Sequence, residues 1–133
     1  MRYPARDEGL LLWQWSRYPA AHRNRANLLI HALTVPFFLA GNVAVLASPF
    51  LGPWWLGVGG GAAMIASVFL QGRTHRRERI PAAPFRDPLD LLERIFLEQW
   101  VTFPRFVASG SFARSWRNPE GGPGPAIDHC RWQ

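Results

Sequence analysis

The chain has 133 residues, enough for one domain, and its net charge is +6, with every one of the 15 basic residues an arginine. No Asp, Glu, Lys or Arg occurs between Arg25 and Arg73, while arginines crowd both flanks of that stretch. This segregation is typical of a membrane protein and argues against a nucleic-acid-binding protein, whose arginines would be interleaved with its folded segments. The single cysteine, Cys130, excludes an intramolecular disulfide and a cysteine-based zinc cluster.

The N-terminal segment does not resemble a signal peptide. Asp7 and Glu8 precede a short apolar run, 10–15, and no small-residue cleavage site follows it. We expect instead an amphipathic helix from roughly Asp7 to Tyr18 that lies in the membrane interface.

The uncharged stretch is too long for one membrane span and suits two. Residues 28–47 supply the roughly 20 helical residues that cross a hydrocarbon core. The segment 48–53, rich in Pro and Gly, predicts a tight reversal, and residues 54–71 would return across. Trp54 and Trp55 would then lie at the headgroup boundary. A soluble helical hairpin would show a polar face, and neither segment has one.

The distribution of arginines predicts the orientation of the two spans. Arginines precede the first span and follow the second, whereas the connecting turn carries no charge. Because positive charge stays on the cytoplasmic side, both termini should face the cytoplasm. We therefore expect an integral protein of a bacterial inner membrane.

Small residues in both spans allow close helix packing. Gly57 and Gly61 form a GxxxG pair, and the first span offers Ala40, Gly41 and Ala44. The pair could mediate a homodimer or could pack within the hairpin, and packing within the hairpin is the interpretation we favour.

A third helix is predicted over residues 88–103. Asp87 is a suitable N-cap, Pro88 fits the first helical position, and Pro104 would end or kink the helix. Its apolar and charged residues fall mainly on opposite sides, and it is too charged to span. We expect it to lie in the interface or across the cytoplasmic mouth of the hairpin.

The predicted fold is thus an all-α membrane protein: a hairpin of two transmembrane helices with an interfacial amphipathic helix on either side. Residues 1–117 would form a single membrane domain. Residues 118–133, which begin with an Asn-Pro-Glu-Gly-Gly-Pro-Gly-Pro run, predict a disordered tail.

Three of the four histidines fall at the expected cytoplasmic rim. His22 precedes the first span, His31 lies about one turn inside it, and His75 follows the second, with Glu78 three residues later on the same helical face. Imidazoles with a carboxylate suit Fe(II) or Zn(II). Each residue also has a simpler role: His31 could hydrogen-bond a neighbouring helix, and His22 and His75, flanked by arginines, could contact headgroups.

Other polar and aromatic residues could line a substrate site beside this rim. Asn27 shares a helical face with His31, although an asparagine here could also be a helix cap. Three phenylalanines in the spans could wall an acyl chain, although aromatic residues in a span commonly face lipid. The candidate substrate-lining set is Asn27, Phe37, Phe38 and Phe69.

Two segments of the sequence resemble a known family. The string His22-Arg-Asn-Arg-Ala-Asn27-Leu-Leu-Ile-His31-Ala-Leu-Thr-Val-Pro36 resembles the entry motif of the fungal 2-hydroxy fatty acid dioxygenase and of the bacterial membrane proteins grouped with it. Residues 71–82, Gln-Gly-Arg-Thr-His-Arg-Arg-Glu-Arg-Ile-Pro-Ala, are similar to the second block of that family. The likeness covers roughly residues 18–110.

The resemblance implies Fe(II)-dependent oxidation of a 2-hydroxy fatty acid to the acid one carbon shorter, with O2 as the oxidant. It implies that His22, His31 and His75 hold the iron, and that Glu78 is a fourth ligand or orients an imidazole. The partners expected are a lipid substrate and the membrane. Two alternatives remain open: a non-catalytic membrane anchor or assembly protein that recruits a partner, and a haem-binding hairpin that uses His31 and His75.

Overall fold

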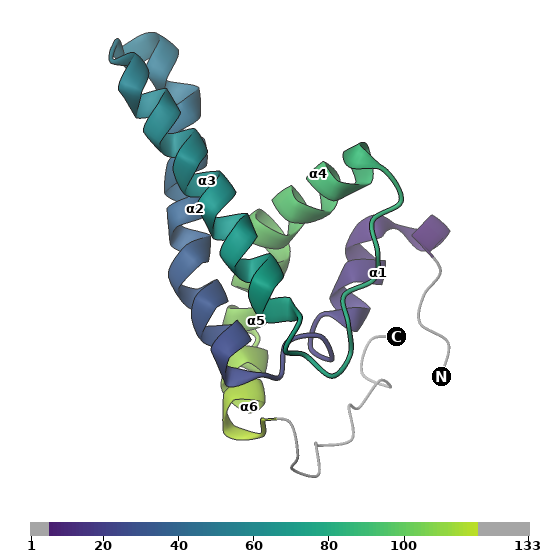
Figure 1. Ribbon diagram of the computed structural model, residues 1–133. Helices are drawn as coiled ribbons and strands as arrows, with labels where there is room; N and C mark the ends of the chain where they lie inside the picture. Colours follow the sequence, from purple (N-terminus) through teal and green to yellow (C-terminus); the bar gives the residue numbers. More distant parts are fainter. Residues whose placement is uncertain (1–5, 120–133) are drawn as a thin grey trace.

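The computed structural model describes residues 6–119, and this part of the chain is all-helical, without strands (Figure 1). Most of the predicted tail, together with His129 and Cys130, lies outside the described residues. The elements in chain order are η1 (Arg6–Glu8), α1 (Leu10–Arg17), α2 (Arg25–Leu51), α3 (Trp54–His75), α4 (Pro88–Leu97), the π-helical turn η2 (Glu98–Thr102), α5 (Phe103–Ala108) and α6 (Ser111–Arg117).

The long helices α2 and α3 pack side by side and extend away from the other helices (Figure 1). Both are long and apolar enough to cross a membrane. They exceed the predicted spans, because α2 begins at Arg25 and α3 continues to His75. The reversal is also shorter than predicted: Gly52, whose φ of 95° favours glycine, ends α2, and Pro53 precedes α3.

Two glycines set the distance between the helices of this pair. A Cβ added to Gly41 would lie 2.5 Å from the carbonyl oxygen of Gly60, and a Cβ on Gly60 would lie 2.5 Å from that of Gly41. Only residues without a side chain permit so close an approach. Of the predicted GxxxG pair, Gly57 contacts Ser48 of α2, while Gly61 has open space beside it. Gly57 therefore serves packing within the pair, and dimerisation stays a prediction.

The helix that begins at Pro88 does not end at Pro104 but continues to Ala108 through a π-helical turn. Proline has no N–H and crowds the preceding turn of a helix. The widened turn just before Pro104 accommodates this defect, and Phe103 N–H donates to the carbonyl of Glu98, five residues back. The sequence shows the proline, but it does not reveal the π-helical turn that accommodates it.

The polar side of α4 faces the protein, and its apolar side faces outward. Asp90 and Arg94 are buried, whereas Leu89 and Leu92 are 65% and 53% exposed. Buried Asp90 forms an ion pair with Arg6 of η1, near the N-terminus. An outward apolar face of this kind is unfavourable for a helix that lies in water.

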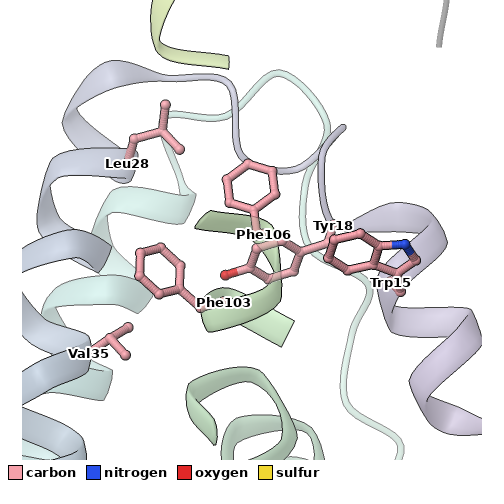
Figure 2. Packing of buried hydrophobic residues seen from close by; sticks show 6 residues of the cluster. All are labelled: Trp15, Tyr18, Leu28, Val35, Phe103 and Phe106. Carbon is pink, nitrogen blue, oxygen red and sulfur yellow. The ribbon is translucent and has the colours of Figure 1, made fainter. Parts of the chain in front are cut away.

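The core lies where α1, α2 and α5 meet. It is largely aromatic, and its members are Trp15, Tyr18, Leu28, Val35, Phe103 and Phe106 (Figure 2). Tyr18 and Phe106 meet edge to face with ring centroids 5.2 Å apart. This cluster fixes the end of the helix pair at which α2 begins and α3 ends.

Candidate metal centre

Three histidines and one glutamate converge at this end of the molecule. His22, His31, His75 and Glu98 each offer a metal-ligating atom, and these atoms all lie within 4.8 Å of one another. His22 comes from the loop before α2, His31 from its second turn, His75 from the last residue of α3, and Glu98 from the π-helical turn. The group therefore joins four separate segments and could hold a metal ion.

The distances inside the group match those between ligands of one ion. The Nε2 atoms of His22 and His31 are 3.4 Å apart. Glu98 Oε1 lies 3.5 Å from the first and 3.2 Å from the second. Ligand atoms about 2.1 Å from a tetrahedral ion are separated by about 3.4 Å. These three atoms thus have the spacing of one face of a tetrahedral site.

The hydrogen bonds of the two buried imidazoles fix which nitrogen is protonated. His22 Nδ1 lies 2.9 Å from the carbonyl oxygen of Tyr18, and His31 Nδ1 lies 3.0 Å from that of Asn27. A carbonyl oxygen only accepts, so each Nδ1 must donate. In a neutral imidazole this leaves Nε2 with a free lone pair that faces the group. A histidine that ligates a metal commonly donates its other N–H in this way.

Burial lowers the pKa of the His22 imidazole below its usual value, against the opposing effect of the Glu98 carboxylate. The Nε2 atoms of His22 and His31 and the Glu98 carboxylate oxygen thus face one another in one small group. Imidazole nitrogens and a carboxylate oxygen at this spacing suit a cation that lies among them.

His75 completes the set. Its Nδ1 is buried and has no hydrogen-bond partner in the part of the chain that the structure describes. Buried polar atoms are normally satisfied, so an orphaned one in a cluster of ligands calls for an explanation. The ring packs edge-on to both other imidazoles, at centroid distances of 4.7 Å from His22 and 5.0 Å from His31. A bound metal would account for the unpaired nitrogen, and the residues present therefore fit one.

Glu78, assigned from the sequence as the fourth ligand or as a partner of a histidine, is not in this group. Its carboxylate accepts hydrogen bonds from the backbone N–H groups of Arg23 and Asn24 and from Asn27 Nδ2. It thus ties the segment after α3 to the loop that carries His22. The carboxylate of the group belongs instead to Glu98, which was not identified as a ligand from the sequence.

One feature of the sequence could have indicated Glu98. It is the only charged residue between Arg94 and Arg105, in an otherwise largely apolar run. A lone carboxylate in a membrane-associated helix is usually paired and functional. The helical spacing that links it to Asp90 and Arg94 also places it on the inward polar face.

The four residues that we expected to line a substrate lie in different surroundings. Asn27 is fully buried, and its side chain bonds Glu78 and Thr74. Phe38 is buried against Phe96 of α4. The other two, Phe37 and Phe69, are 65% and 61% exposed on the outer surface of the helix pair. Asn27 is thus engaged in fixing the loop beside the site.

A second polar cluster lies beside the site between α2, α3 and the π-helical turn. The amides of Gln71 and Gln99 bond each other at 2.7 and 3.2 Å, and Gln71 Nε2 also donates to Thr34 Oγ1 at 2.8 Å. All three side chains are buried. Paired amides hold the turn that carries Glu98 against the helix pair, because breaking them would leave polar groups unsatisfied.

Comparison with known proteins identifies no relative: no family model, no curated protein and no solved structure matches this chain.

Proposed function

We propose that this chain is an Fe(II)-dependent membrane oxygenase that acts on a 2-hydroxy fatty acid or a related lipid chain. The observation that carries the proposal is the group His22, His31, His75 and Glu98, whose ligand atoms lie within 4.8 Å of one another. Three imidazoles and one carboxylate suit Fe(II) or Zn(II), and they leave positions of a six-coordinate iron open for substrate and O2. The likeness of the sequence to the 2-hydroxy fatty acid dioxygenase family adds support.

In the proposal, α2 and α3 form a transmembrane hairpin. Only 33% and 17% of their most apolar stretches are buried inside the protein, whereas the core helix of a soluble protein would be mostly buried. Arg76 and Arg77 follow α3 and are exposed, and Arg25 opens α2. By the positive-inside rule this end of the hairpin, which carries the metal centre, faces the cytoplasm.

The outward apolar face of α4 fits a position in the membrane interface. Exposed apolar residues on this helix and its flanks are Ile80, Phe85, Leu89, Leu92 and Trp100. Burial of such residues among lipid tails is favourable by about 25 cal/mol for each Å² removed from water. An acyl chain lying beside α4 would have its polar end at the depth of the histidines.

Bound iron would supply the redox chemistry with O2, and the protein supplies position and exclusion of water. His22 and His31 are held by hydrogen bonds from their Nδ1 atoms to carbonyls, so their Nε2 atoms stay aimed at the centre. Glu98 contributes the negative charge, and Phe103, 5.9 Å from the His31 ring, shields one side. The overall reaction balances as RCH(OH)COOH and O2 giving RCOOH, CO2 and water.

The test is turnover by the purified protein in lipid nanodiscs after anaerobic loading with Fe(II). With a long-chain 2-hydroxy fatty acid, we expect O2 uptake and formation of the acid one carbon shorter. The unsubstituted fatty acid of equal length is the matched control, and His31→Ala is the control for the site. Bound iron without turnover of the hydroxy acid would overturn the oxygenase and favour a non-catalytic anchor.

The geometry does not favour the haem-binding alternative. In that reading, His31 and His75 would ligate a haem iron from its two faces. Ligand atoms of His22 and Glu98 lie within 4.8 Å of both histidines, in the space that a porphyrin would have to occupy. A single ion fits this space.

A further inference from the structure

Tyr18 contacts two members of the candidate metal centre at once. Its ring stacks on that of His22, with centroids 3.8 Å apart and planes 20° from parallel. Its hydroxyl donates to Glu98 Oε1 at 2.9 Å. Its carbonyl oxygen accepts the hydrogen bond from His22 Nδ1. One residue outside the group thus holds two of its four members.

We propose that Tyr18 is the positioning residue of this centre, which acts through Glu98 and His22 to set the geometry and the affinity of the bound metal. The inference rests on the proposed metal centre and adds the residue that regulates its strength. Tyr18 acts through two groups, its hydroxyl on Glu98 and its ring on His22.

The Tyr18 hydroxyl contacts the Glu98 oxygen that would bind the metal. Glu98 Oε1 is the same atom that faces the Nε2 atoms of His22 and His31. The Tyr18 hydroxyl donates a hydrogen bond to this oxygen and so fixes its position. A glutamate side chain has several rotatable bonds, so without this donor its carboxylate would sample other positions. Such supporting hydrogen bonds typically change metal affinity by about 10- to 100-fold.

The ring holds His22 in place from the other side. Tyr18 is 4% exposed and belongs to the aromatic core, where it also packs against Phe106 (Figure 2). His22 lies in a loop rather than in a helix, so its orientation depends on contacts such as this one. The stacked ring connects the candidate metal centre to the aromatic core.

The variant Tyr18→Phe separates these two parts, because it removes the hydroxyl and keeps the stacked ring. Ser67→Ala is the matched control: Ser67 is also buried, its hydroxyl bonds only Ala63 of its own helix, and it does not touch the group. Binding of Co(II), followed by its visible absorption, reports both affinity and coordination geometry. We expect Tyr18→Phe to weaken Co(II) binding about 10- to 100-fold with an altered spectrum. Ser67→Ala should bind as the parent does.

A double-mutant cycle with Glu98→Ala, which removes the acceptor of the Tyr18 hydroxyl, tests whether Tyr18 acts through that carboxylate. In the Glu98→Ala background, loss of the hydroxyl should weaken Co(II) binding less than about twofold further, because the hydrogen bond between the two residues is already absent. Equal affinities of Tyr18→Phe and the parent, equal losses in Tyr18→Phe and Ser67→Ala, or additive losses in the cycle would each overturn the role of Tyr18. Failure of the parent protein to bind Co(II) would instead overturn the metal centre itself.

Discussion

Asn27 Nδ2 donates a hydrogen bond of 2.7 Å to Glu78 Oε1, and this contact joins the first turn of α2 to the segment that follows α3. Asn27 Oδ1 in turn accepts from Thr74 Oγ1 at 2.8 Å. The backbone N–H groups of Arg23 and Asn24 also donate hydrogen bonds to the Glu78 carboxylate. A buried carboxylate thus fastens the loop that carries His22, without itself belonging to the candidate metal centre.

Replacement of Glu78 by alanine should therefore destabilise the fold without abolishing metal binding. The substitution leaves buried donors unsatisfied, at a cost of about 1–3 kcal/mol each. Thermal unfolding in detergent measures the loss, and the exposed Glu93→Ala is the control, with little expected change. Loss of bound metal in Glu78→Ala, with retention in Glu98→Ala, would show that the ligand assigned from the sequence is the true one.

The close approach of α2 and α3 gives a second prediction. Gly60→Ala places a Cβ 2.5 Å from the Gly41 carbonyl oxygen, so the two backbones must separate. We expect a destabilisation of about 1–3 kcal/mol, the usual cost of overpacking. Gly59→Ala is the matched control, since a Cβ there meets nothing within 4 Å. Unfolding in detergent compares the two, and equal stability of both variants would contradict the observed packing.

The environment of α4 can be tested by cysteine labelling in vesicles, with Cys130 first replaced by serine. Position 92 points outward, and the cysteine of the Leu92→Cys variant should be shielded from an aqueous thiol reagent, because it would lie among lipid tails. Its neighbour, as Glu93→Cys, should react readily. Equal reactivity of both positions in vesicles would place α4 away from the membrane.

Several features of the fold could be predicted because they depend on local composition. The absence of charge between Arg25 and Arg73 is enough to define two long apolar helices, and Gly52 with Pro53 is enough to reverse the chain. The structure brings His22, His31 and His75 together as their shared position at one end of the spans suggested. Such inferences need no knowledge of how distant segments pack.

The position of Glu98 could not be predicted in the same way. The amphipathic pattern of α4 separates its charged side from its apolar side, but it does not show that the charged side faces the protein and that Leu89 and Leu92 point outward. The π-helical turn before Pro104 also shifts the register of the residues that follow, and no periodic pattern reveals such a turn. The role of Tyr18 depends on contacts with Glu98, 80 residues away, and tertiary packing alone creates them.

Metal analysis of the purified protein tests the central claim most directly. After anaerobic loading with Fe(II) and removal of excess metal, the parent protein should retain about one ion per chain, as expected for four ligands that share one ion. His31→Ala should retain none, yet still be extracted from the membrane fraction, because insertion depends on the apolar residues of α2 and α3. Retention of equal metal by both proteins, or of none by the parent with either Fe(II) or Zn(II), would contradict a metal centre at His22, His31, His75 and Glu98.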